Sequence, residues 1–442
     1  MTGDGGGLAL TLLGFGMVAS FMALIMTRRL TPLVALIIVP VVFGLLTGEA
    51  AGLGKMMIEG VTKLAPTGVM LMFAILYFGL MNDAGLFDPA VRRLVRLVHA
   101  DPVKISIGTV LLAALVSLDG DGSTTYVITV AALLPLYRCM GMSRLRMVCL
   151  LMLTSGVMNI TPWGGPTARA ASALGLDARD IFVPLIPAMI GGLVFLVALA
   201  WIFGRAERRR LAGQVVEISV EELVEVCVSQ DAEARRPRLL WFNAILTAVL
   251  LALLVVGLLP LPILMMLAFA IALIANYPRI EDQKARISAH AGNVLAVVSL
   301  IFAAGIFTGI LGGTGMVEAM SRGVVAVIPP ELGPYMAPIT ALLSLPFTFF
   351  ISNDAFYFGV LPVLSEAAGH YGIAPVEIAR ASLIGQPFHL LSPLVPSTYL
   401  LVTLAGVELA DHQKFTFKWA AVVGLVMSLV AMATLVFPLA RF

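Results

Sequence analysis

The residues of this chain that could do chemistry gather in short polar strings between long apolar runs. One string, residues 119–124, reads Asp-Gly-Asp-Gly-Ser-Thr, and another, residues 352–354, reads Ser-Asn-Asp. If the apolar runs cross a bilayer, an ionised carboxylate at mid-depth costs about 2.5–3.5 kcal/mol and by default marks an ion or proton path. We therefore expect Asp121 and Asp354 to carry protons or to bind a hard divalent cation, which prefers oxygen ligands.

The roles of several other ionisable residues have more than one interpretation. Asp119 fits proton or metal coupling and a structural ion pair equally well. His389 could relay protons near neutral pH or fill a packing role. Arg169 could face a substrate carboxylate, anchor a loop or pair with an Asp, and Arg380 could be functional or structural. Glu366 is expected at the membrane interface. The histidines and cysteines form no cluster with metal-ligand spacing, so no zinc or copper site is expected.

Two further strings interrupt apolar runs with proline. Residues 159–167 read Asn-Ile-Thr-Pro-Trp-Gly-Gly-Pro-Thr, and residues 392–398 read Ser-Pro-Leu-Val-Pro-Ser-Thr. Proline removes an amide donor and clashes with the preceding turn, so both runs are predicted to be broken helices. A broken helix exposes amides that attract anions and carbonyls that hold cations. We expect a small hydrophilic anion to bind at Gly122, Ser123, Thr124, Asn159, Thr161, Gly164, Gly165, Thr167, Asn353, Ser392, Pro393, Ser397 and Thr398.

The composition excludes a soluble enzyme. Hydrophobic residues make up 60% of the 442 residues and charged residues 12%, about half the charged fraction of a soluble domain. Apolar runs of about 17–25 residues, long enough to cross a bilayer, recur along the chain. The predicted crossings of this all-α polytopic membrane protein are Leu8–Met26, Leu30–Thr47, Pro66–Asn82, Leu145–Leu174, Ile181–Phe203, Leu239–Leu259, Leu261–Asn276, Gly292–Leu311, Val376–Leu404 and Phe417–Phe437.

Lysine and arginine collect on one side of these ten crossings, which the positive-inside rule assigns to the cytoplasm. They are densest in the polar loop Gly204–Arg238. Both termini are then extracytoplasmic, and the expected location is the plasma membrane, the inner membrane of a bacterium. The run at Leu8–Met26 lacks a basic leader and a cleavage site, so it is read as a retained first span. The polar loop is predicted to hold a short surface helix that links two halves.

The two halves, residues 1–203 and 239–442, resemble each other at a nearly constant offset of about 230 residues. Phe73-Ala74 matches Phe302-Ala303, and Thr161-Pro162 matches Ser392-Pro393. Each half holds five crossings, an odd number, so the second half must enter the membrane upside down. Inverted repeats of this kind are the architecture of many secondary transporters, which hold their substrate at the repeat interface.

Two stretches fit no crossing. Ile105–Leu136 and Ala337–Ser365 each have two apolar arms around a polar tip. The arms are about 12–14 residues long, too short to cross, so each pair is predicted to be a re-entrant hairpin. The first hairpin would open to the cytoplasm and the second to the outside. Non-helical backbone at that depth survives only inside protein or beside a watery cavity, so both tips should point at a site.

At these strings the sequence resembles the citrate–metal–proton symporter family (CitMHS) of the ion transporter superfamily. The resemblance covers essentially the whole chain, and its most specific strings are Asp-Gly-Asp-Gly-Ser-Thr and Pro-Trp-Gly-Gly-Pro-Thr. The segments that carry it are residues 117–125, 159–170, 352–359 and 385–399.

The resemblance implies a homodimer in which each protomer has a scaffold domain and a transport domain that moves like an elevator. It implies import of citrate chelated to Mg2+ or Ca2+ together with protons, with the metal as co-substrate and no resident cofactor. Sodium-coupled relatives carry a Ser-Asn-Thr pattern at the hairpin tips. The added carboxylates Asp121 and Asp354 are hypothesised to replace sodium coupling.

Two other functions are alternatives to this one. A transporter of the same fold could carry another small carboxylate or oxyanion, such as a dicarboxylate, gluconate or arsenite. An intramembrane aspartyl hydrolase would also use paired aspartates. Such enzymes need two aspartates on separate spans in fixed sequence contexts, and the repeated arrangement of the two halves gives no reason to expect proteolysis. No enzyme activity and no nucleic-acid partner are expected. The expected partners are the citrate–metal complex, protons and the lipid bilayer.

Overall fold

A computed structural model of the chain describes residues 4–27, 29–89, 93, 101–120, 122–211, 234–392 and 394–441. These residues form helices joined by short turns, and none of them lies in a β-strand. Eight helices in the described part are long and apolar enough to cross a membrane. The chain is therefore a multi-pass membrane protein, as the sequence predicts.

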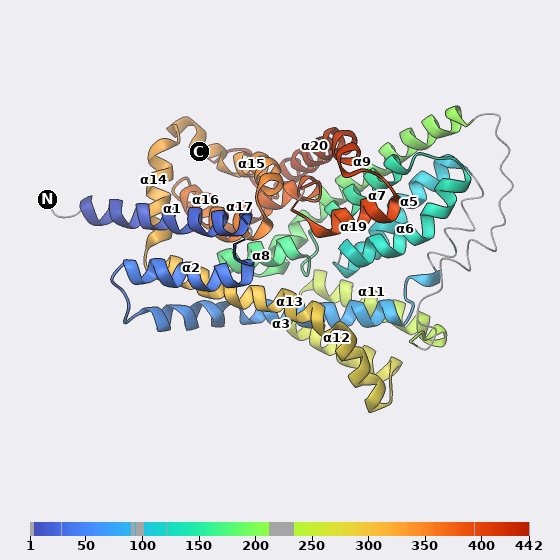
Figure 1. The fold of residues 1–442 in the computed structure, drawn as a ribbon, viewed down its shortest axis with the longest axis horizontal. Coiled ribbons are helices and arrows are strands. Elements are labelled where there is room, and N and C mark those ends of the chain that lie inside the picture. The colour runs from blue at the N-terminus through green and yellow to red at the C-terminus, as the bar shows by residue number, and fades with distance from the viewer. Residues whose placement is uncertain are drawn as a thin grey trace.

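One layer of the molecule is built around two long helices, α3 (Leu53–Asp83) and α13 (Ile280–Gly313), which contact each other along their length. Figure 1 shows α2, α11 and α12 in the same layer. These three helices are α2 (Pro32–Leu46), α11 (Leu240–Val256) and α12 (Leu261–Asn276). α12 packs on α3, and α2 packs on α13.

Glycines set the close approach of α3 and α13. A Cβ atom on Gly60 would lie 2.0 Å from the carbonyl oxygen of Gly305, and one on Gly309 would lie 2.3 Å from the carbonyl oxygen of Met56. No larger residue fits at these positions without separating the helices. Small residues allow helix backbones to approach in this way inside membranes, where van der Waals packing drives association. The α3–α13 pair is therefore a tightly joined wall.

The other layer, which we call the hairpin layer, contains both hairpins and both broken helices. Figure 1 shows α5, α6, α7 and α9 with α15, α19 and α20 above the α3–α13 pair in this view. From the first half it contains α5 (Pro102–Val116), η1 (Ser117–Asp119), α6 (Gly122–Cys139), α7 (Arg144–Met158), α8 (Gly165–Leu174) and α9 (Ala178–Arg210). From the second half it contains α15 (Met336–Phe350), η4 (Ala355–Val360), α16 (Leu361–Gly369), α17 (Pro375–Ser382), η5 (Leu383–Gly385), α18 (Gln386–His389), α19 (Pro396–Ala405) and α20 (Leu409–Ala433).

The remaining described elements are short or lie at the edge of these layers. They are α1 (Asp4–Met26), η2 (Pro237–Leu239), α14 (Met316–Val327) and η3 (Pro330–Tyr335). α1 packs on α2 and α14. Both halves present the same order of elements, with a long helix, a hairpin, a broken helix and a final long helix. The inverted sense of the second half stays a prediction.

The structure corrects several predicted boundaries. α3 begins at Leu53 instead of Pro66, and α13 begins at Ile280 instead of Gly292, because each helix continues through a charged segment beyond its apolar run. The hairpin arms are longer than the predicted 12–14 residues, since α5 has 15 residues and α6 has 18. By length and composition the first arm of each hairpin, at residues 102–119 and 330–350, could itself cross a membrane.

Other predictions fall on residues that the structure does not describe. The loop Gly204–Arg238, in which a surface helix is expected, falls mostly on residues 212–233, outside the described residues. Asp121 and Pro393 also lie outside them. The roles assigned to these two residues stay predictions.

Candidate functional site

The tip of the first hairpin is held by the first helix break. α5 passes into the short turn η1, and the chain reverses at Gly120, which has φ +76°. Its left-handed backbone favours glycine, and a Cβ atom there would lie 2.8 Å from Cδ1 of Trp163. The indole nitrogen of Trp163 donates a hydrogen bond of 2.8 Å to the carbonyl of Leu118. Trp163 therefore clamps the tip against the break.

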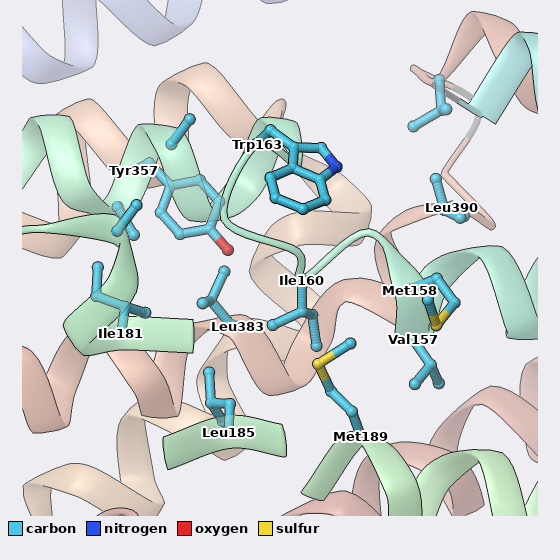
Figure 2. Packing of buried hydrophobic residues seen from close by; sticks show 14 of the residues in the cluster. Val157, Met158, Ile160, Trp163, Ile181, Leu185, Met189, Tyr357, Leu383 and Leu390 are labelled. Atoms are coloured by element: carbon cyan, nitrogen blue, oxygen red, sulfur yellow. The ribbon is translucent and has the colours of Figure 1, made fainter. Parts of the chain in front are cut away.

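The first predicted break is confirmed. α7 ends at Met158, and α8 begins at Gly165 with Pro166 in its first turn, where a missing amide hydrogen costs nothing. The Thr167 hydroxyl donates a 2.8 Å hydrogen bond to the carbonyl of Ile160. Figure 2 shows Ile160 and Trp163 within a buried apolar cluster that surrounds the break. The buried Thr161 hydroxyl has no hydrogen-bond partner among the described residues.

The second predicted break is confirmed as well. α18 ends at His389, and α19 begins at Pro396. The Ser392 hydroxyl donates a 2.6 Å hydrogen bond to the carbonyl of Phe349, at the end of the first arm of the second hairpin. The Thr398 hydroxyl donates to the carbonyl of Leu390. These two hydroxyls therefore hold the non-helical segment in place by satisfying backbone carbonyls.

The tip of the second hairpin meets the first break through an ion pair. Nε of Arg169, on α8, lies 2.6 Å from Oδ1 of Asp354, which is 8% exposed. Beside it the amides of Asn353 and Gln386 face each other at 3.4–3.5 Å, and Gln386 also donates a 2.8 Å bond to the Tyr357 hydroxyl. Residues 355–360 form a π-helical turn, a form of helix that often occurs at functional sites.

A cavity of about 590 Å3 lies between the hairpin layer and the α3–α13 wall. We call it the hairpin cavity. From the hairpin layer it is lined by Asp119, Gly120, Ser123, Thr124, Val127, Ile128, Trp163, Gly165 and Arg169. From α3 and α13 the lining includes Phe78, Asn82, His290 and Asn293. It thus presents a carboxylate, hydroxyls and a guanidinium to one volume. Such a surface can hold a small polyoxygenated anion and a hard cation together.

A second cavity of about 510 Å3 lies toward the other end of the same wall. We call it the Lys63 cavity. It is lined by Glu59 and Lys63 from α3, by residues 172–174 at the end of α8, by glycines near the end of α13, and by Glu366 from α16. α8 contributes to both cavities, with Arg169 in one and Ser172 in the other.

The structure brings together only part of the predicted site. Asp119, Ser123, Thr124 and Gly165 line the hairpin cavity, and so does Arg169. Gly122 lies beside Ser397, since a Cβ atom on the glycine would lie 3.5 Å from the serine hydroxyl oxygen. The other predicted binding residues that the structure describes line neither cavity; these are Asn159, Thr161, Gly164, Thr167, Asn353, Ser392 and Thr398.

The ambiguous ionisable residues take different positions. Nδ1 of His389 lies 2.6 Å from the carbonyl of Thr348, so that nitrogen is the donor, and the side chain lines neither cavity. Arg380 donates to the carbonyls of Asp180 and Val436 at 2.7 and 3.0 Å, which is an anchoring role. Among the described residues no group of three or more acidic, histidine or cysteine side chains is arranged to hold a metal ion.

The structure also shows residues that sequence reasoning missed. Asn82, His290 and Asn293 face the hairpin cavity from α3 and α13. Trp163 and Gln386 lie within the segments that carry the family resemblance, but the sequence predicted no role for either. His290 lies two residues before the predicted start of a crossing at Gly292, and Asn293 lies one residue after that start, and no role was predicted for either. No local pattern distinguishes them, because their position depends on how α13 packs on α3.

The membrane helices and the polar cavity between two layers define a multi-pass membrane transporter. The family model described as citrate transporter, CitMHS, matches residues 21–385. The chain therefore belongs to the CitMHS citrate transporter family, which the sequence strings had indicated. The family consists of transporters, so the chain is a transporter and not an enzyme.

Two relatives from Bacillus subtilis (strain 168) are similar over nearly their whole length. A citrate transporter is 58% identical over 426 residues, which cover 96% of this chain and 98% of the relative. A Mg(2+)/citrate complex secondary transporter is 51% identical over 425 residues, with the same coverage of 96% and 98%.

Solved transporter structures share the fold at low sequence identity. The YdaH transporter of Alcanivorax borkumensis has a TM-score of 0.52 at 15% identity, covering 87% of this chain and 88% of that one. MtrF of Neisseria gonorrhoeae, from a class of antimetabolite efflux pumps, has a TM-score of 0.56 at 14% identity, covering 86% and 83%. These likenesses concern the fold alone.

Proposed function

We propose that this chain imports citrate in complex with Mg2+ or Ca2+, together with protons, by an elevator movement of the hairpin layer against the α3–α13 wall. The observation that carries the proposal is the hairpin cavity, in which Asp119, Ser123, Thr124 and Arg169 face one volume at a helix break. A relative of 51% identity that carries the Mg(2+)/citrate complex supports the choice of cargo.

The net charge of the cargo favours import as a metal complex. Each negative charge that enters against an inside-negative potential costs about 2.3 kcal/mol per 100 mV. Free citrate at neutral pH carries three such charges, and a divalent ion leaves one. Two accompanying protons would make the load positive, so that the potential drives import. The proposed coupling is therefore electrogenic.

Within this proposal, the Arg169–Asp354 ion pair couples proton binding to anion binding. Arg169 lines the hairpin cavity and also pairs with Asp354 at 2.6 Å. A proton on Asp354 removes the carboxylate charge that holds the guanidinium, which is then available to a citrate carboxylate. Proton and anion binding would thus favour each other. Asp354, expected either to carry protons or to bind metal, thus takes the proton role in this proposal. Asp121, beyond the described residues, stays a proposed metal ligand, and Asp119 in the hairpin cavity is a second carboxylate that could face the metal.

The architecture proposed with this function has two inverted repeats and a scaffold layer distinct from the transport layer. The two cavities support the division into layers, because each is lined by α3 and α13 on one side and by elements of the hairpin layer, such as α8, on the other. We further propose a homodimer in the plasma membrane, with both termini outside. In that orientation the Asp83 end of α3 and the hairpin cavity face the cytoplasm.

Transport of labelled citrate in proteoliposomes tests the proposal. We expect uptake that requires Mg2+ or Ca2+, rises with an inward proton gradient, acidifies the lumen and does not change with sodium. A panel of Mg2+, Ca2+, Zn2+ and Ni2+ identifies the accompanying ion. Sodium-dependent uptake would refute proton coupling. Stronger competition by a dicarboxylate, gluconate or arsenite than by citrate would favour the alternative cargo.

A further inference from the structure

The α3–α13 wall of the hairpin cavity is mostly apolar, and three polar side chains interrupt it. The apolar lining on this wall comes from Ala74, Ile75, Phe78, Ala296 and Val297. Asn82 of α3 and His290 and Asn293 of α13 share the cavity with Asp119 and Arg169 of the opposite layer. They lie where a cargo held by the hairpin layer would present the oxygens that face the α3–α13 wall.

The position of His290 is fixed from two sides. Its Nε2 atom lies 2.9 Å from Oδ2 of Asp83, which also accepts a 3.2 Å hydrogen bond from Arg286. A carboxylate only accepts, so Nε2 carries the hydrogen, and a neutral ring keeps Nδ1 as an acceptor. The ring lies on Gly79, where a Cβ atom would come within 2.7 Å of two ring atoms. Glycine at position 79 therefore leaves the space that the imidazole occupies.

The three side chains offer a consistent set of hydrogen-bonding groups. Asn82 and Asn293 provide amide donors for a carboxylate, and each also provides an acceptor. His290 provides an acceptor for a hydroxyl group or for a water bound to a metal ion. None of the three brings a net charge when the imidazole is neutral. The set suits a hydrated metal–carboxylate complex of low net charge.

The Lys63 cavity has different chemistry. Its α3 and α13 lining contributes Glu59, Lys63 and several glycines, and none of the three polar residues of the hairpin cavity reaches it. Both linings belong to helices that the Gly60–Gly305 contact holds tightly together. A cargo that moves from one end of the wall to the other would exchange one set of partners for another.

We infer that Asn82, His290 and Asn293 form a stationary half-site that contacts the metal–carboxylate cargo at the hairpin cavity only. The inference rests on the proposed transport of citrate with a divalent metal. It goes beyond that function because it assigns cargo contacts to the scaffold layer, and it predicts that the two membrane faces bind the cargo with different affinities.

The KM for citrate with Mg2+ at each membrane face tests this inference. Right-side-out vesicles report the outer KM, and inside-out vesicles of the same cells report the inner KM, with the amount of protein matched. His290→Ala and Asn293→Ala should raise the inner KM about three- to tenfold, as expected for the loss of one hydrogen bond, and leave the outer KM unchanged. His290→Asn, which keeps a donor and an acceptor, should restore part of the loss.

Two features of the chain provide controls. Asn293 is exposed and has no hydrogen bond to another described residue, so its replacement keeps the test valid if His290→Ala fails to fold. His370→Ala is the matched control, since His370 is exposed and lines neither cavity. That variant should leave both KM values unchanged.

The outcomes separate the inference from the proposed function. If the wild-type protein does not carry citrate with a metal, the proposed function fails. If it does, but both variants leave the inner KM unchanged, raise both KM values equally or raise only the outer one, the stationary half-site is refuted. A rise confined to the inner face in both variants supports it.

Discussion

The ion pair between Arg169 and Asp354 joins the first broken helix to the second hairpin, and its removal tests the proposed coupling. The exposed side-chain fractions are 21% for the arginine and 11% for the aspartate. Nε of Arg169 lies 2.6 Å from Oδ1 of Asp354. Removing one partner of a buried pair costs about 3–5 kcal/mol of folding free energy, because the other charge is left uncompensated. Arg169→Ala should therefore strongly destabilise the protein.

A double-mutant cycle isolates the pair from other losses. The double variant Arg169→Ala with Asp354→Asn removes both charges, so it should be more stable than Arg169→Ala alone. We expect a coupling energy of about 2 kcal/mol, within the range found for residues in direct contact. The measurement is thermal or denaturant unfolding in detergent. A matched control is the Arg322–Glu318 pair, whose side chains are 58% and 65% exposed. Its coupling should stay below about 1 kcal/mol.

Transport by the single variants tests the proposed role of the Arg169–Asp354 pair in proton coupling. Asp354→Asn leaves Arg169 available to citrate, so citrate binding should persist while its dependence on pH is lost. Arg169→Ala should lose citrate affinity. Binding to purified protein across a pH series, with lumenal acidification in proteoliposomes, separates these outcomes. Additive stability losses would show that the pair contributes nothing. An unchanged pH dependence in Asp354→Asn would remove Asp354 from coupling.

Three further changes have expected outcomes. Gly60→Ala should lower the unfolding free energy by about 1–3 kcal/mol, because the new Cβ would lie 2.0 Å from the Gly305 carbonyl oxygen. The control Gly54→Ala should be tolerated, because the space around its Cβ is open. Trp163→Phe leaves the Leu118 carbonyl without its 2.8 Å donor and should raise the KM for citrate several-fold in uptake assays. An unchanged KM would contradict the role of Trp163 in holding the first hairpin tip. Glu207→Gln should lower the unfolding temperature, since the buried carboxylate binds Arg146 and Arg210 at 2.6–2.9 Å; equal stability would refute this.

Local chemistry explains why much of the fold could be predicted from the sequence. Each helix break follows from proline at fixed positions, such as Pro162 and Pro166, whose effect on the helix does not depend on distant contacts. The apolar runs likewise indicated membrane helices, because the bilayer requires length and apolarity in one continuous segment. The polar string at the first hairpin tip predicted that Asp119, Ser123 and Thr124 would face a site. These three residues line the hairpin cavity, and their role in binding stays a prediction.

Other features depend on contacts between segments far apart in the chain. Arg169 and Asp354 are separated by 185 positions, and three readings of Arg169 stayed open until the structure paired them. The true starts of α3 and α13 were missed because apolarity marks the part of a helix inside the bilayer, not the whole helix. His290 faces the cavity only because α13 packs on α3 at glycines.

By itself the sequence therefore determined the membrane setting, the interrupted helices and the family strings, since each depends on residues close together along the chain. Only the tertiary structure decided which side chains share a cavity. A hydroxyl in a polar string can line a cavity, as that of Ser123 does, or donate to a backbone carbonyl at a helix break, as that of Ser392 does. That choice depends on the packing of both layers, which no local pattern encodes.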